Sequence, residues 1–265
     1  MKVFVFDLDG TVLVNSQIAP DVKKLLKRLS QSYIVIFASG RMFSSILKVM
    51  RNFDLDGIIV AYNGSYIFLK DEIKTYCINP KDAAAVIDFL RALKVHRQVY
   101  VDDVLYVEEK NEFAMAYSQQ SGVEFHVTED LKETIKNGCI FKILAYDTPE
   151  NVRKIKDQAS ECDFGNVDLF TSSESYLEFV RKGINKKVAI EFLAQKMGFS
   201  LSEVIAFGDG ENDAELLSAA GMSFAMFPGN EKSLTAGSKI IDNLDGRGIL
   251  RAFKVLKYSH MLEER

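Results

Sequence analysis

The sequence contains few of the residues that mark a disulfide scaffold or a zinc site. It has no tryptophan, four prolines, three cysteines and three histidines in 265 residues. The cysteines are odd in number and far apart, so we expect three core thiols and no disulfide framework. The histidines are scattered as well, and a lone histidine is more often structural than a metal ligand, which argues against zinc chemistry. These residues are Cys77, Cys139, Cys162, His96, His126 and His260.

Long apolar runs and long basic runs are also absent. No apolar stretch approaches the roughly 20 residues of a bilayer span, and the chain enters a predicted strand at once, so we expect a cytoplasmic protein without a signal peptide. The formal charge of −4 argues against a nucleic acid or an anionic membrane as the partner. With 48% hydrophobic and 26% charged residues, the composition is that of a globular protein with a sizeable core. We expect a small-molecule partner.

Short apolar segments alternate with segments of helical period, which predicts a doubly wound parallel sheet of the α/β class, a Rossmann-like core. In the first predicted helix, Val22, Leu25, Leu26 and Leu29 share one face, and Pro20 stands near its start, where proline is tolerated. Further covering helices are predicted over 212–221 and 246–259. The predicted strands of this sheet are 2–6, 33–38, 57–61, 204–207 and 222–225.

The middle of the chain has a different pattern. Asn63 and Gly64 predict a tight turn in a hairpin, and Asn79 with Pro80 then interrupts the alternation. Helices are expected over 82–93, 112–121 and 149–159, and strands over 98–102, 104–109, 139–145, 167–171 and 176–180. Strand pairs separated by helices indicate an α+β domain, 81–181, inserted into a core domain formed by 1–80 and 182–265.

The first strand runs directly into two aspartates in the stretch "VFVFDLDGT". Side chains two apart on an extended segment point to the same side, so Asp7 and Asp9 are expected to converge while Leu8 returns to the core. In a doubly wound sheet the ligand site lies beyond the carboxyl ends of the strands, where these aspartates fall. An ordinary Asp-Gly turn would explain Asp9 and Gly10, but it leaves Asp7 unexplained.

Two neighbouring carboxylates repel by several kcal/mol at an effective dielectric constant of ~20, so the pair needs a cation or a shared proton. The stretch "AFGDGENDAEL" supplies further oxygen ligands after another strand, in Asp209, Asn212 and Asp213. Oxygen ligands without nearby histidine or cysteine favour Mg²⁺. The alternative is a loop in which Asn212 or Asp213 caps the following helix, and the two roles are compatible.

An anion site is expected where "IFASGRM" leads from the second strand into a helix. The hydroxyl of Ser39 and the backbone N–H groups around Gly40 and Arg41 could bind phosphoryl oxygens, although a serine there could simply be the N-cap. Lys186 begins another predicted helix, where the helix dipole disfavours a cation. A nearby anion would remove that conflict, whereas the ordinary alternative for a lysine is a solvated surface position.

Together, four segments resemble the haloacid dehalogenase superfamily, whose members are mostly phosphatases. They are "DLDGT" after the first strand, "SGR" after the second, "KGINK" before a helix and "GDGEND" after a later strand. The long insertion, with "AYNGS" just before it, is similar to the Cof-type sugar-phosphatase branch, which carries a type IIB α/β cap. The resemblance covers the whole chain, and the four motifs in this order are highly specific.

The resemblance implies roles for the residues at these positions. Asp7 would be the nucleophile that accepts the phosphoryl group, and Asp9 the general acid and base. Mg²⁺ would be held by Asp7, by the backbone carbonyl of Asp9 and by Asp209, with Asp213 supporting these ligands and Thr11 supporting the loop.

The same resemblance implies the residues that bind the phosphate. Ser39 and Gly40 would bind phosphoryl oxygens, Asn212 would lie near the phosphate, and Lys186 would bridge the nucleophile and the phosphate. The family often has threonine where Ser39 stands, which preserves the hydroxyl, and glycine where Lys187 stands, which adds a charge.

These residues predict a Mg²⁺-dependent phosphatase that acts on small phosphorylated metabolites, sugar phosphates above all, through an aspartyl phosphate. One alternative is a phosphomutase or phosphotransferase, in which the phosphoryl group passes to another alcohol. A second alternative is a signalling receiver module, which also uses an acidic cluster, Mg²⁺ and a phosphorylated aspartate. The long insertion and the second aspartate, Asp9, argue against a receiver, which needs neither a lid nor an acid for a leaving group.

Overall fold

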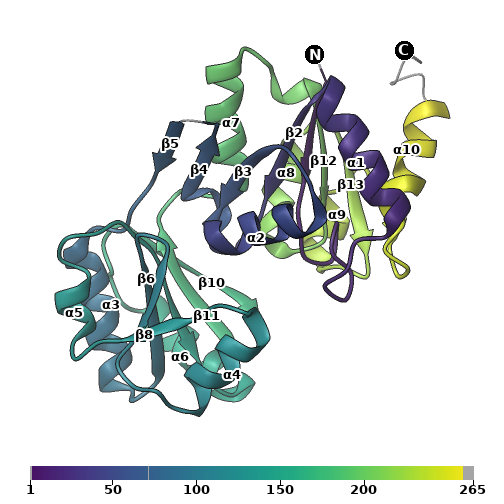
Figure 1. Cartoon of the computed structure of the whole chain (residues 1–265). Coiled ribbons are helices and arrows are strands. Elements are labelled where there is room, and N and C mark those ends of the chain that lie inside the picture. Colours follow the sequence, from purple (N-terminus) through teal and green to yellow (C-terminus); the bar gives the residue numbers. More distant parts are fainter. Residues whose placement is uncertain (1, 71, 259–265) are drawn as a thin grey trace. The chain divides into compact units, whose positions relative to one another are not determined.

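The computed structural model describes residues 2–70 and 72–258. The chain divides into two compact units, one formed by residues 1–73 and 185–265 and the other by residues 74–184 (Figure 1). The sequence places the inserted domain at 81–181, within the second of these units. Each unit has its own sheet, and each is described by itself below.

The first unit is built on a sheet that is parallel through its centre. The β1 strand is buried along its whole length and pairs in parallel with β2 and with β12. Parallel pairing continues outward to β3 and β14, and β4 then runs antiparallel to β3 as the second strand of the predicted hairpin. The order is β14 (Lys239–Asp242), β13 (Met222–Phe227), β12 (Val204–Gly208), β1 (Val3–Phe6), β2 (Ile34–Ala38), β3 (Ile58–Ala61), β4 (Tyr66–Leu69) and β5 (Glu72–Thr75).

Helices cover both faces of this sheet. From β1 the chain moves one way along the sheet to β3, and from β12 it moves the other way to β14. Right-handed crossovers therefore place α1 and α2 on one face and α8 and α9 on the other. The predicted doubly wound α/β fold is confirmed (Figure 1). The helices are α1 (Pro20–Ser32), α2 (Phe43–Phe53), α7 (Lys186–Met197), α8 (Ala214–Ala219), α9 (Glu231–Ala236) and α10 (Gly248–Tyr258).

Short turns complete the carboxyl edge of the sheet, where the motifs lie. The 3-10 turn η1 (Tyr62–Gly64) follows β3, and η3 (Glu211–Asp213) follows β12. A third turn of this kind, η2 (Leu201–Glu203), lies at the opposite edge, where it leads into the amino end of β12. Because the central strands are parallel, the segments after β1, β2, β3 and β12 all emerge at the same edge.

The second unit is α+β, as predicted. Its sheet has the order β10 (Val167–Ser173), β11 (Tyr176–Arg181), β9 (Ile140–Tyr146), β6 (His96–Val101), β7 (Val104–Val107) and β8 (Phe125–Val127). An apolar core joins one face of this sheet to α3 (Pro80–Ala92), α5 (Leu131–Thr134) and α6 (Pro149–Ser160). On the other face, α4 (Glu112–Ser121) contacts the sheet where Tyr100 donates a hydrogen bond to Tyr117. A turn at Asp102 and Asp103 joins β6 to β7, with both residues in the left-handed region.

The prediction of three core thiols is wrong. Cys77 and Cys139 form a disulfide, and the thiol of Cys162 is exposed. The two bonded cysteines are 62 residues apart and are brought together by a bridge between Ile78 and Ile140. The spacing of the cysteines in the sequence does not predict this pair, because the contact depends on the pairing of two distant segments at Ile78 and Ile140. His260 and the end of the predicted helix 246–259 lie outside the described residues.

Among the residues that the structure describes, no helix is both long enough and apolar enough to cross a bilayer. Several short elements were not predicted, namely α5, β8, α9 and β14. Each has six residues or fewer, which is too short for a periodic pattern to be recognised.

Candidate active site

Asp7 and Lys186 form the buried centre of the site. Asp7 follows β1 directly and is 6% exposed, and Lys186 is fully buried as the first residue of α7. The ammonium of Lys186 donates a hydrogen bond to Oδ1 of Asp7 at 2.5 Å. The predicted helix start is confirmed, and Asn185 caps it by accepting a hydrogen bond from the N–H of Val188. The unfavourable position of a cation at a helix start is thus offset by an adjacent carboxylate.

Asp213 links this centre to the loop after β12. Its Oδ1 accepts a second hydrogen bond from Lys186 at 2.6 Å, and its Oδ2 accepts from the backbone N–H groups of Asp209 (3.1 Å) and Gly210 (2.9 Å). Asp213 therefore both pairs with the lysine and shapes the short turn. It stands at the N-cap position of α8 but makes no side-chain capping hydrogen bond to that helix, so the alternative in which it caps the following helix is wrong.

The loops after β1 and β12 meet at Asp209. Thr11 donates a hydrogen bond from its hydroxyl to Oδ1 of Asp209 at 2.9 Å. Gly10 has a φ of +79°, and a Cβ atom there would lie 2.1 Å from Oδ2 of Asp209, so only glycine allows this approach. Buried Asn243 donates from its amide to the carbonyl oxygens of Gly10 (2.7 Å) and Thr11 (3.0 Å). Sequence reasoning missed Asn243, and no local pattern connects it to a loop so far away in the chain.

Three carboxylates at this edge can bind one cation. Asp7, Asp209 and Asp213 each offer an oxygen atom, and these atoms lie within 4.8 Å of one another. Among the described residues, one ammonium, that of Lys186, is bonded to this cluster, so two negative charges are uncompensated when all three carboxylates are ionised. A hard divalent cation fits both this charge and this set of oxygen ligands.

The pKa values show how unfavourable the cluster is without a cation. Burial raises the pKa of Asp7 well above its ordinary value, against the opposing charge of Lys186. Burial and the charge of Asp213 raise the pKa of Asp209 to about 7. Burial alone would lower the pKa of Lys186, but Asp213 and Asp7 raise it. A bound cation would stabilise the ionised carboxylates and remove this penalty.

Asp9 lies apart from the buried cluster. Its side chain is 54% exposed, and both of its oxygens are bonded to Arg41, Oδ2 to Nε at 2.6 Å and Oδ1 to Nη2 at 2.5 Å. This two-point geometry suits a guanidinium and a carboxylate. The sequence placed Arg41 before a helix but assigned it no partner, because the pair joins the ends of two different strands.

The loops after β2 and β12 bring the remaining predicted residues to the same edge. Ser39 is 2% exposed, and its hydroxyl accepts a hydrogen bond from the N–H of Arg41 at 3.2 Å. The residue that caps α2 is Met42, so the alternative of Ser39 as the N-cap is wrong. Asn212 donates from its amide to Oδ1 of Asn63 at 2.7 Å. The sequence indicated Asn63 only as a turn residue, and its contact with Asn212 was not predicted.

Comparison with known proteins identifies the family. The family model for haloacid dehalogenase-like hydrolases matches residues 4–253. An HMP-PP phosphatase from Klebsiella pneumoniae is 27% identical over 229 residues, which are 85% of this chain and 84% of that protein. A crystal structure from Thermotoga maritima has 34% sequence identity and a TM-score of 0.88, covering 100% of this chain and 98% of the other.

A sugar phosphatase described as haloacid dehalogenase subclass IIB has the same fold, with a TM-score of 0.82 and 21% identity, covering 99% of this chain and 100% of the other. The protein belongs to the haloacid dehalogenase-like hydrolases, which the four motifs resemble, in the Cof-type branch that the long insertion and "AYNGS" resemble. Its reaction class is that of a phosphoric monoester hydrolase.

Proposed function

We propose that this hydrolase is a Mg²⁺-dependent phosphatase of small phosphorylated metabolites, with sugar phosphates as its substrate class. The observation that carries the proposal is the buried cluster in which three carboxylates face a single ammonium. A divalent cation would offset the charge of the ionised carboxylates and allow a phosphate to approach them. The substrate class is supported by relatives that bear the names HMP-PP phosphatase and sugar phosphatase.

In this proposal Asp7, Asp209 and the backbone carbonyl of Asp9 hold the metal. Asp213 supports them, because its two oxygens are already bonded to Lys186 and to backbone N–H groups. When bound, Mg²⁺ neutralises charge on the nucleophile and on the phosphate, which otherwise repel each other. Thr11 keeps Asp209 oriented through its hydroxyl.

Asp7 attacks the phosphorus in line and forms an aspartyl phosphate, which water then hydrolyses. Lys186 donates to Asp7 and is placed to neutralise charge on the phosphoryl group as the new bond forms. Ser39, Gly40 and Asn212 bind phosphoryl oxygens through a hydroxyl, a backbone N–H and an amide. These groups contribute to catalysis by positioning the phosphoryl group and by neutralising its charge.

Asp9 acts as the general acid and then as the general base. It protonates the departing alcohol in the first step and removes a proton from the attacking water in the second. The observed pair with Arg41 holds both oxygens of Asp9 as hydrogen-bond acceptors. Asp9 must therefore leave Arg41 and carry a proton before it can act as an acid. The inserted α+β unit has the role of the cap domain in this proposal.

The test is a screen of phosphorylated metabolites for Mg²⁺-dependent release of inorganic phosphate. Asp7→Asn should abolish turnover, because an amide is not a nucleophile, and Asp9→Asn should reduce it by ~10²-fold or more. Asp56→Asn, at an exposed position of the same unit, is the matched control. Wild-type turnover by Asp7→Asn would refute the assignment, and transfer to an added alcohol in place of phosphate release would identify a phosphotransferase.

A further inference from the structure

The turn after β3 has an unusual backbone. Tyr62 and Asn63 have φ values of 49° and 54°, and Gly64 follows with a φ of 111°. Two successive residues other than glycine in the left-handed region are uncommon, and asparagine tolerates this region better than tyrosine does. Such a conformation persists only where the surrounding structure holds it, so the contacts of the turn identify the segments that stabilise it.

These contacts reach the loops that carry the site. The N–H of Tyr62 donates to the carbonyl of Arg41, and the N–H of Asn63 donates to the carbonyl of Ser39, both at 3.0 Å. A Cβ atom on Gly64 would lie 2.4 Å from the carbonyl oxygen of Asn185, the residue that caps α7. The turn thus contacts both the anion-binding loop and the start of the helix that carries the buried lysine.

The side chain of Asn63 adds a third connection. It is buried, with the residue 7% exposed, and its Oδ1 accepts a hydrogen bond from Asn212 at 2.7 Å. A Cβ atom on Gly40 would lie 3.1 Å from this Oδ1 and 3.2 Å from Nδ2 of Asn63. The amide of Asn63 therefore lies between Gly40 and Asn212, two residues that the proposed function assigns to phosphoryl binding.

We propose that Asn63 is a positioning residue for phosphoryl binding. Its Oδ1 takes one N–H of the Asn212 amide and so fixes the plane of that amide, which leaves the second N–H of Asn212 to donate to a phosphoryl oxygen. Its own Nδ2 lies beside Gly40 and defines the wall of the anion site there. Glycine would satisfy the backbone of this turn equally well, so the side chain is what asparagine contributes. The inference rests on the proposed function.

The experiment separates the side chain from the backbone. Asn63→Gly keeps the left-handed conformation and removes the amide, and the probe is inorganic phosphate as a competitive inhibitor. We expect its inhibition constant to rise by about 10-fold, and kcat/KM to fall by about 10- to 100-fold, with little change in Tm. The matched control is Asn15→Gly, because Asn15 is exposed and also has a positive φ, of 51°. It should match the wild type in every measurement.

A double-mutant cycle tests the coupling to Asn212. Asn212→Ala should cause a similar loss of phosphate inhibition, and the combined loss with Asn63→Gly should be smaller than the product of the two single losses, because both variants remove the same Asn63–Asn212 hydrogen bond. Losses that multiply, or wild-type inhibition in Asn63→Gly, would overturn the inference. Asn63→Asp is a second variant should Asn63→Gly fail to fold. Its carboxylate beside Gly40 should weaken phosphate inhibition by about 10-fold or more through repulsion, and an unchanged constant would count against the inference.

Failure of the inference and failure of the proposed function give different results. If Asp7→Asn is inactive while Asn63→Gly behaves as the wild type, the positioning role is wrong and the phosphatase stands. If Asp7→Asn retains turnover, the proposed function itself is wrong, whatever the Asn63 variants do.

Discussion

At the scale of single residues, the site depends on one lysine that has no contact with water. The side chain of Lys186 is fully buried, and its ammonium forms ion pairs with the carboxylates of Asp7 and Asp213. Its neighbour Lys187 makes a surface pair with Glu191 on the same helix. Two adjacent lysines therefore have different environments. In the sequence, Lys186 was distinguished by the anomaly of a cation at a helix start and by the "KGINK" motif of the resemblance. The resemblance implied its contact with Asp7, whereas its hydrogen bond to Asp213 was not predicted, because that residue lies after a distant strand.

We expect Lys186→Met to lower both stability and activity. Removing one member of a buried charged group leaves the others without compensation, which costs about 3 kcal/mol or more in the free energy of unfolding. Turnover should fall by at least ~10²-fold, since charge on the phosphoryl group is no longer neutralised. Denaturant unfolding and phosphate release measure the two effects. Lys187→Met is the control and should change neither, and equal behaviour of the two variants would show that burial of Lys186 has no functional consequence.

At the scale of elements, the sequence predicted the local elements, and the resemblance grouped the motif residues, but several contacts between distant segments were missed. The strand that ends in Asp7 and the helix that begins at Lys186 follow from short patterns, and both are confirmed. The contacts of Asn243, of Arg41 with Asp9 and of Asn63 with Asn212 depend on which strands lie side by side. Because such contacts are set by sheet order, a single sequence does not reveal them. The incorrect interpretation of the cysteines has the same cause.

The disulfide should stabilise the second unit. It joins Cys77, where the chain enters this unit, to Cys139 just before β9, across 62 residues. Closing a loop of this length in the unfolded chain stabilises the folded state by about 4 kcal/mol in the chain-entropy account. Cys77→Ser, or a reductant, should therefore lower the unfolding free energy of this unit by up to that amount. Cys162→Ser is the control and should have no effect, and a reductant that leaves thermal unfolding unchanged would contradict the prediction.

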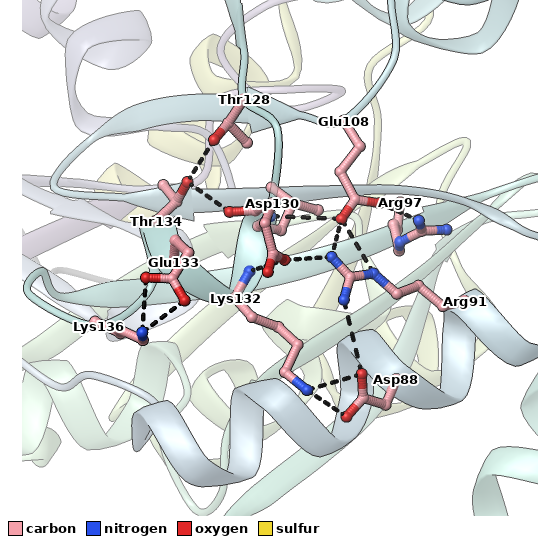
Figure 2. A network of polar contacts seen from close by, with 11 residues as sticks. Asp88, Arg91, Arg97, Glu108, Thr128, Asp130, Lys132, Glu133, Thr134 and Lys136 are labelled. Carbon is pink, nitrogen blue, oxygen red and sulfur yellow. Dashed lines mark hydrogen bonds and ion pairs between the residues drawn. The ribbon is translucent and has the colours of Figure 1, made fainter.

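At the scale of the whole molecule, the chain has two units that are stabilised in different ways. The unit formed by residues 1–73 and 185–265 contains the carboxylate cluster, and residues 74–184 contain the disulfide. The second unit also has a half-buried charge network, in which Glu108 accepts hydrogen bonds from Arg91 and Arg97 and Asp130 accepts from Arg91 (Figure 2). Metal binding should therefore raise the unfolding free energy of the first unit, and a reductant should lower that of the second. These two effects on stability should be additive.

The acidic cluster makes the effect of the metal depend on pH. Asp209 has an ordinary pKa of 3.8 when unfolded and a pKa raised to about 7 in the metal-free fold. The folded state therefore binds this proton more tightly, and the resulting stability is fully present below about pH 4 and is lost as the pH rises through about 7. Mg²⁺ competes with the proton for the same carboxylate, so its binding weakens as the pH falls.

We accordingly expect Mg²⁺ to raise the Tm of the wild type more at about pH 8 than at about pH 5.5, because the cation replaces stability that the lost proton no longer provides. At 100 times its dissociation constant, a ligand that binds only the folded state stabilises it by about 2.7 kcal/mol. Thermal unfolding at both pH values, with and without Mg²⁺, measures the difference. Asp209→Asn should lose most of the Mg²⁺ effect, while Asp56→Asn should keep it. A Tm increase that is equal at both pH values, or that survives in Asp209→Asn, would place the metal elsewhere than on this carboxylate cluster.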